Sequence, residues 1–198
     1  MIRVYNNLNQ TIMKSIFEKD LSGEMVSPNE PGYNALIEDI FATIKVATEM
    51  NTGYRTPEEV HGYMDKILGK PLEESTTVLP PLYIDYGKPI TIGKGCFIQQ
   101  CCTFFGRGGI TIGDEVFIGP KVNLITINHD PDPENRSATY GRPITIEDKV
   151  WMRNQFDRPS RSTYWLRRNY RGGQCSDQRR SSYDCGSRES SQIYQENQ

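Results

Sequence analysis

The sequence predicts a mainly β protein: a left-handed parallel β-helix, preceded by a small α-helical N-terminal region and followed by a disordered tail. Three observations support this fold class. Aliphatic or aromatic residues recur every six positions from about residue 80 to residue 152. Apolar residues at helical spacing precede them, and the composition changes abruptly after Met152. We therefore divide the chain into residues 1–79, 80–152 and 153–198.

Residues 13 to about 75 are predicted to be helical. One apolar stripe recurs at helical spacing and comprises Leu36, Ile37, Ile40, Phe41, Ile44 and Ala47. A second helix is predicted to begin with Thr56 as its cap, because Pro57 follows in the first turn and Glu59 stands three residues after the cap. This helix should end at Gly69. We expect both apolar stripes to pack against the rest of the protein.

From Pro80 the period changes to six. The repeat positions are Ile92, Ile98 and Phe104, then, after a slip of two residues, Ile112, Ile118 and Leu124, and finally Ile146 and Met152. Six residues per flat face and three faces per turn are typical of a left-handed parallel β-helix, in which each coil buries its aliphatic residues by stacking on the next. Residues 130–143 interrupt the repeat and are predicted to form an inserted loop.

This loop carries the residues best suited to catalysis. His129 precedes it and is a candidate general base, because histidine is the side chain that ordinarily changes protonation near neutral pH. Asp130, Asp132 and Glu134 are nearby carboxylates, any of which could orient the ring. The alternative is that His129 is a hydrogen-bonded structural residue.

The tail differs from the rest of the chain. After Val150 there is no further valine, alanine or lysine, and arginine, serine, glutamine and tyrosine dominate. We interpret the change as a frameshift within the Met152 codon, since a reading in the neighbouring frame restores an aliphatic residue every six positions. Trp165 has a single codon, and its shifted triplet, followed by Leu166, encodes the glycine that the repeat requires. The alternative is a genuine Arg/Ser-rich disordered extension.

The bulk properties narrow the function classes. A net charge of -2 and a pI near 5.8 give no reason to expect a nucleic-acid partner. No apolar run is long enough to span a membrane, and the N-terminus lacks a secretory signal, so a cytoplasmic location is expected. The five cysteines are Cys96, Cys101, Cys102, Cys175 and Cys185, and their spacing matches no zinc pattern. No metal is expected.

Three motifs together carry a resemblance to a known family. They are SGEMVSPNEPGYNAL, PPLYIDYGKPITIGKGCFI, and GGITIGDEVFIGPKVNLITINHDPDPENR with the following PITIEDKVW. Over residues 20–151 the chain resembles the maltose/galactoside O-acetyltransferase group of hexapeptide-repeat acetyltransferases. The resemblance implies transfer from acetyl-CoA to a sugar or similar hydroxyl acceptor, in a homotrimer whose active sites lie between adjacent subunits. His129 corresponds to the catalytic base in the N-H-x-x-x-P loop of that family.

The resemblance also assigns roles to other positions. Asp85 occupies an acceptor-side position, and Gln99 stands where the family usually has an acceptor-contacting asparagine. Trp151 corresponds to a tryptophan that lines the pantetheine tunnel, although it could instead cap the hydrophobic end of the stack. Arg107 follows Gly106 where an aspartate is common in the family, and we expect it to be a solvated turn residue.

The encoded tail lacks the later coils that supply much of the coenzyme A site in the family and complete the trimer. The resemblance therefore implies weak or absent activity for the chain as encoded. The alternative is a non-catalytic relic or interaction module, which the absence of acetyl-CoA binding would identify. A zinc-dependent carbonic anhydrase of the same fold needs three histidines, and the chain has only His61 and His129.

Overall fold

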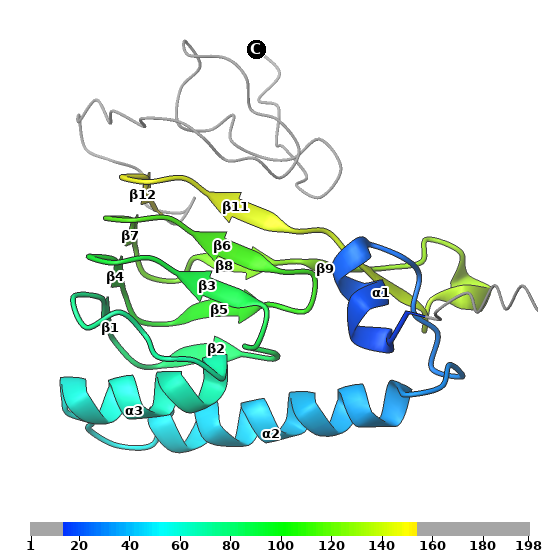
Figure 1. Cartoon of the computed structure of the whole chain (residues 1–198), viewed down its shortest axis with the longest axis horizontal. Coiled ribbons are helices and arrows are strands. Elements are labelled where there is room, and N and C mark those ends of the chain that lie inside the picture. Colours follow the sequence, from blue (N-terminus) through cyan, green and yellow to red (C-terminus); the bar gives the residue numbers. More distant parts are fainter. Residues whose placement is uncertain (1–13, 154–198) are drawn as a thin grey trace, which may run out of the picture.

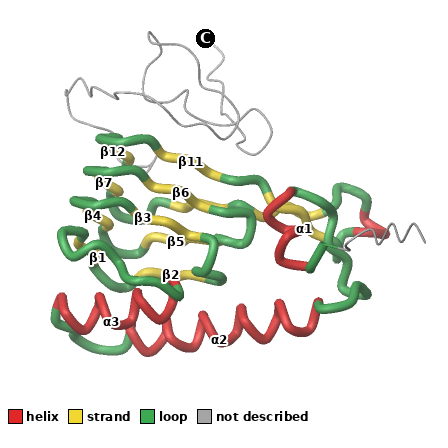
Figure 2. The backbone as a smooth tube through the Cα atoms, in the orientation of Figure 1, coloured by secondary structure: helices red, strands yellow, loops and turns green. Residues whose placement is uncertain are grey.

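The computed structural model describes residues 14–153. The frameshift interpretation, the predicted disorder of the tail, and Cys175 and Cys185 concern residues outside this range. The described chain contains three α-helices, a stack of parallel strands and an inserted antiparallel hairpin (Figures 1 and 2).

The strands form the three faces of a parallel β-helix, so this prediction is confirmed. One face contains β1 (Thr77–Val78), β4 (Phe97–Ile98), β7 (Phe117–Ile118) and β12 (Trp151–Met152). The second contains β2 (Leu82–Ile84), β5 (Cys102–Phe105) and β8 (Asn123–Ile125), and the third β3 (Ile90–Ile92), β6 (Ile110–Ile112) and β11 (Ile144–Ile146). The stack begins with β1, three residues before the boundary placed at residue 80.

The predicted repeat positions pair in register inside the stack. Ile98 pairs with Ile118, and Phe104 with Leu124; all four side chains are buried. Partners lie 20 positions apart, two residues more than three six-residue faces. The two extra residues fall at the corner that follows β2 and β5. In the third coil the same corner, after β8, holds an inserted hairpin.

This hairpin contains β9 (Ile127–His129), a 3-10 turn at Pro133–Asn135 and β10 (Thr139–Gly141). The strands β9 and β10 are antiparallel. The insertion therefore begins a few residues before the loop that the sequence predicts at 130–143.

Two helices pack beneath the first coil (Figure 1). They are α2 (Tyr33–Asn51) and α3 (Pro57–Leu68). The predicted cap of α3 is confirmed, because the Thr56 hydroxyl accepts from the Glu59 amide and the Glu59 carboxylate accepts from the Thr56 amide. Residues 69–76 are not helical, so the predicted helical stretch was too long at its end.

The prediction that the whole apolar stripe of α2 is packed was wrong in part. Leu36 and Ala47 are buried, but Phe41 is 65% exposed and Ile44 is 39% exposed. The buried face is completed instead by Thr43 and Met50, so the contact surface is rotated relative to the stripe.

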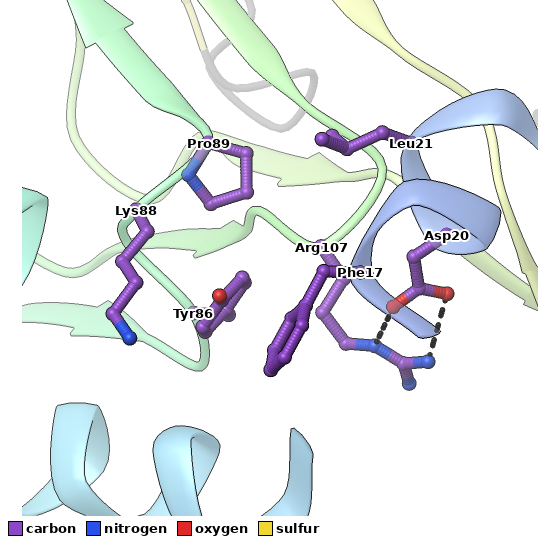
Figure 3. A pocket seen from close by; sticks show the side chains of 7 residues that line it. All are labelled: Phe17, Asp20, Leu21, Tyr86, Lys88, Pro89 and Arg107. Atoms are coloured by element: carbon purple, nitrogen blue, oxygen red, sulfur yellow. Dashed lines mark hydrogen bonds and ion pairs between the residues drawn. The ribbon is translucent and has the colours of Figure 1, made fainter. Parts of the chain in front are cut away.

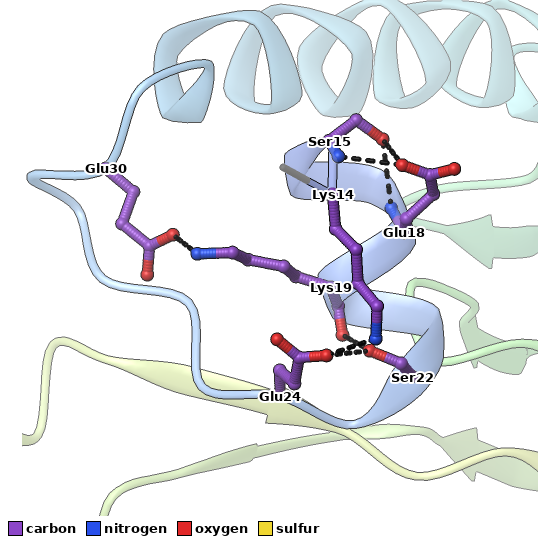
Figure 4. A network of polar contacts seen from close by, with 7 residues as sticks. All are labelled: Lys14, Ser15, Glu18, Lys19, Ser22, Glu24 and Glu30. Atoms are coloured by element: carbon purple, nitrogen blue, oxygen red, sulfur yellow. Dashed lines mark hydrogen bonds and ion pairs between the residues drawn. The ribbon is translucent and has the colours of Figure 1, made fainter. Parts of the chain in front are cut away.

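The third helix, α1 (Ile16–Ser22), lies against the hairpin. Ile16 joins Val26 and Leu36 in a small separate core, and Val26 exchanges backbone hydrogen bonds of 2.7 and 2.9 Å with Thr139 of β10. A surface network surrounds α1, in which Lys14 pairs with Glu24, Lys19 pairs with Glu30, and Ser15 and Glu18 form a capping box (Figure 4). Helix α1 therefore connects the N-terminal region directly to the inserted hairpin.

No helix within residues 14–153 combines the length and the apolar character needed to cross a membrane.

Candidate active site

The inserted hairpin presents His129 at the end of β9. In the antiparallel register His129 lies opposite Thr139. The tip of the hairpin is ordered by short polar contacts: Asp130 accepts from the Asp132 amide at 2.9 Å, and Asp132 accepts from the Glu134 amide at 3.1 Å. A rigid turn of this kind on a β-helix scaffold is a typical place for catalytic residues.

The tautomer of His129 follows from one contact. The exposed ring places Nδ1 2.7 Å from the carbonyl oxygen of Arg136. A carbonyl oxygen can only accept, so Nδ1 carries a proton, and in the neutral ring Nε2 then retains its lone pair. The expectation that a nearby carboxylate orients the ring was wrong, because a main-chain carbonyl bonds Nδ1.

Arg107 lies beneath the hairpin and is 7% exposed, so the prediction of a solvated turn residue was wrong. Its Nε donates to Oδ2 of Asp20 at 2.8 Å, and its Nη2 donates to Oδ1 at 2.9 Å (Figure 3). Nη2 also donates to the Thr139 hydroxyl at 3.1 Å. Burial raises the pKa of Asp20 above its ordinary value, and the bonds from Arg107 offset part of that rise. The partner on α1 explains why this turn residue is buried.

A small pocket of about 160 Å³ lies beside this ion pair (Figure 3). Its lining includes Phe17 and Leu21 from α1 and Tyr86 from the loop after β2. The Phe17 and Tyr86 rings stack with their centroids 6.0 Å apart. The pocket is therefore lined both by α1 and by the edge of the β-helix, which are in contact beside it.

Asp85 lies at the same corner as the hairpin, in the first coil. Its Oδ1 accepts from the amides of Tyr86 at 2.6 Å and Gly106 at 2.8 Å. Burial raises the pKa of Asp85 to about 6, although these hydrogen bonds oppose the rise. Asp85 also lines a hollow of about 280 Å³ between α2 and the second sheet face, together with Asn51 and Phe105. Asp85 follows β2, and the hairpin follows β8. These two strands lie two strand spacings apart in the stack, roughly 10 Å.

The two other predicted site residues lie on a different part of the chain. Gln99 directly follows β4. Its backbone N–H donates to the Ile118 carbonyl oxygen at 2.9 Å. Trp151 lies in β12 and is 42% exposed, in register with Phe117. Since its side chain is outside the stack, it does not cap the hydrophobic interior. Within one chain the structure brings Asp85 and His129 to one corner and places Gln99 and Trp151 on the first face.

The second histidine has a structural contact. His61 lies in α3, and its Nε2 is 2.8 Å from the Thr76 carbonyl oxygen. Its Nε2 therefore carries the proton, the reverse of His129. Among residues 14–153 no group of three histidine, cysteine or acidic side chains is arranged to hold a metal ion. Cys96 and Cys102 are buried in the stack, and burial raises the pKa of both thiols.

Comparisons with known proteins show which proteins this chain is similar to. No family model matches the chain. Nodulation protein L of Rhizobium meliloti is 33% identical over 142 residues, which cover 68% of this chain and 73% of that protein. The crystal structure of a hexapeptide-repeat-containing acetyltransferase from Vibrio cholerae, complexed with acetyl coenzyme A, is 31% identical with a TM-score of 0.59, over 70% of this chain and 74% of that one. A maltose O-acetyltransferase from Clostridium difficile is 28% identical with a TM-score of 0.62, over 68% and 72%.

The β-helix of this chain is similar to the solved structures of these acetyltransferases, and this similarity places it among the β-helical acyltransferases. The chain belongs to the hexapeptide-repeat acetyltransferase family.

Proposed function

We propose that this protein transfers an acetyl group from acetyl-CoA to a hydroxyl of a sugar or a similar small acceptor, with His129 as the general base. The hydrogen bond from Nδ1 of His129 to the Arg136 carbonyl carries the proposal, because it leaves Nε2 unprotonated on an exposed ring. A base needs a free lone pair within reach of its substrate, and this arrangement provides one.

The reaction is a direct transfer in a ternary complex. Nε2 takes the proton of the acceptor hydroxyl while the oxygen forms a bond to the thioester carbonyl carbon. The C–S bond then breaks, and the coenzyme A thiolate receives the proton from the imidazolium. The Arg136 carbonyl accepts from the positively charged ring as well as from the neutral ring, so the ring keeps its orientation through the cycle.

Acetyl-CoA is the proposed co-substrate. The Vibrio cholerae relative was solved with acetyl coenzyme A bound, and the aligned part of this chain is 31% identical to it. Trp151, on the outer surface of β12, is the proposed contact to the pantetheine arm.

We also propose a homotrimer whose active sites are shared between chains, because the site residues form two separate groups on one chain. Asp85 and His129 lie at one corner, whereas Gln99 and Trp151 lie on the first face, which also carries exposed Phe117. A site composed of His129 from one chain and Trp151 from the next would unite the two groups.

A sugar acceptor is supported by the relatives, one of which is a maltose O-acetyltransferase. Asp85 and Gln99 are proposed acceptor contacts. Loss of the later coils, if the tail is frameshifted, would lower activity in the chain as encoded relative to a chain read in the restored frame.

The test is release of coenzyme A thiol from acetyl-CoA with maltose and simple galactosides as acceptors, in encoded and frame-restored chains. His129→Ala in the frame-restored chain is expected to lower the rate by roughly a hundred- to ten-thousand-fold and to leave acetyl-CoA binding largely intact. His61→Gln, the matched control, should retain the rate. Undiminished turnover in H129A would refute the assignment of the base. A frame-restored chain that neither binds acetyl-CoA nor transfers acetyl groups would favour the non-catalytic alternative.

A further inference from the structure

The geometry points to Arg107, held by Asp20, as the residue that positions His129. This inference rests on the proposed function, since it concerns the histidine assigned there as the base. Arg107 is a positioning residue: it contacts the strand opposite His129 and does not touch the imidazole.

The contacts form a continuous path from α1 to His129. The Arg107 guanidinium donates twice to Asp20 on α1 and once, at 3.1 Å, to the Thr139 hydroxyl on β10. Thr139 is the residue that faces His129 across the hairpin. Its backbone also exchanges two hydrogen bonds with Val26. Thr139 is thus held by its side chain and by both of its backbone polar groups.

Close backbone packing prevents the hairpin from sliding on this support. A Cβ atom on Gly141 would lie 2.4 Å from the Asp20 carbonyl oxygen and 2.8 Å from the Cα of Gly108. The Gly108 amide in turn donates to the Thr126 hydroxyl at 2.8 Å, just before β9. Helix α1, the Arg107 turn, β10 and the residue before β9 are therefore in direct contact.

The position of β10 determines the tautomer of His129. The carbonyl that accepts from Nδ1 belongs to Arg136, three residues before Thr139 in the returning arm of the hairpin. A displacement of that arm relative to β9 would take the carbonyl away from Nδ1 and allow the proton to move to Nε2. A neutral imidazole protonated at Nε2 has no lone pair to offer at that nitrogen.

A buried ion pair is suited to holding β10 in place relative to β9. Both side chains are nearly inaccessible, at 8% for Arg107 and 3% for Asp20, so separating them would leave a buried charge without its partner. The pairs of Lys14 with Glu24, which is exposed, and of Lys19 with Glu30, which is partly buried, are more accessible to water than the Arg107 pair. Only the Arg107 pair reaches β10 among the ion pairs formed by residues 14–153.

The test is long-range proton–nitrogen NMR of the two imidazoles in the full encoded chain. The wild-type spectrum should contain one ring protonated at Nδ1, His129, and one protonated at Nε2, His61. In Arg107→Met and in Asp20→Asn, the His129 signals should shift to an average of both tautomers while those of His61 stay in place. Thr139→Val keeps the ion pair, removes only the hydroxyl link, and should shift His129 in the same direction.

Two controls separate positioning from general loss of stability. Lys19→Met removes a partly buried ion pair from the same helix, and Met64→Ala opens the core far from the hairpin, since Met64 is fully buried in α3. Neither should change the His129 tautomer in a folded chain. The inference is overturned if His129 stays protonated at Nδ1 in folded T139V and R107M, or if M64A shifts it as far as R107M does.

Kinetics give a second readout in the frame-restored chain. T139V and R107M should lower kcat by as much as about a hundredfold, with little change in KM for acetyl-CoA, because misplacing a catalytic group affects the chemical step. The NMR result does not depend on turnover. A failure of the base assignment, seen as full activity in H129A, is therefore distinguishable from a failure of the positioning role.

Discussion

Arg107 and Asp20 form a bidentate ion pair across 87 positions of sequence, with N–O distances of 2.8 and 2.9 Å. The pair joins a turn of the β-helix to α1, and α1 in turn packs on the hairpin that carries His129. An element at the start of the described chain thereby contributes to the geometry of the candidate active site.

Breaking this pair should destabilise the fold. Arg107→Met or Asp20→Asn is expected to lower the free energy of unfolding by about 3–5 kcal/mol, since each leaves a buried charge unpaired. Urea denaturation followed by circular dichroism measures the change. The double variant should lose less than the two single variants combined, and additive losses would show that the two residues do not interact.

Gly141 and Gly62 provide opposite tests of backbone packing. Gly141→Ala should destabilise the chain by about 1–3 kcal/mol, because its Cβ would meet the Asp20 carbonyl oxygen at 2.4 Å. Gly62 lies in the exposed face of α3 with nothing within 4 Å of an added Cβ. Gly62→Ala should therefore stabilise by about 1 kcal/mol through helix propensity. Equal thermal shifts for the two variants would contradict the packing described at Gly141.

Asp85 should make stability depend on pH. Its pKa is raised from 3.8 to about 6 in the folded chain, so the folded state holds a proton that the unfolded state releases. The protonated carboxyl contributes up to about 3 kcal/mol to the free energy of unfolding. This contribution is complete below pH 4 and is lost as the pH rises through 6. Asp20 adds a change of the same sign.

The difference between wild type and Asp85→Asn isolates the contribution of Asp85. The variant should gain stability relative to wild type as pH rises from 4 to 7, measured by urea denaturation at each pH. A constant difference across this range would show that the Asp85 carboxyl does not titrate as described.

Sharing of the site between chains can be tested by mixing variants. In the frame-restored chain, His129→Ala and Trp151→Ala should each be impaired, but trimers assembled from both contain some sites with two intact halves. Partial recovery of acetyl transfer after co-refolding is expected, with light scattering as the check on assembly. If both residues act within one chain, mixing will recover nothing.

The frameshift interpretation predicts a local change in the gene. Sequencing across the codons for Trp151 to Asn154 should decide between two outcomes. An extra base in the record alone would mean that the true protein continues the six-residue repeat. An extra base in the gene itself would mean that the encoded tail is real.

Much of the fold could be predicted because it follows from local periodicity. Ile98 and Ile118 occupy equivalent positions of a repeat, and repeats stack on themselves. The cap at Thr56 was equally local. The position of His129 beside an inserted segment also followed from the sequence, because the interruption of the period marked that segment.

The contacts that organise the site could not be predicted from local periodicity. The burial of Arg107 depends on Asp20, far upstream, and the partner of His129 is a main-chain carbonyl that no residue type identifies. A signal for α1 was nevertheless present, since Ser15 and Glu18 have the spacing of a capping box. The predicted helical stretch from residue 13 already included Asp20, but neither it nor the box indicates the contact of Asp20 with Arg107.

The corner at which every coil of the β-helix gains its extra residues has one more implication. Pairing along the faces stays at 20 positions up to β8, and the whole hairpin is accommodated before β11 resumes its register with β6. Differences in length between coils are therefore confined to one corner of the β-helix, where they do not alter the packing of the interior. Different loops could be exchanged at that corner to alter which molecules are recognised, while the remainder of the scaffold keeps its shape.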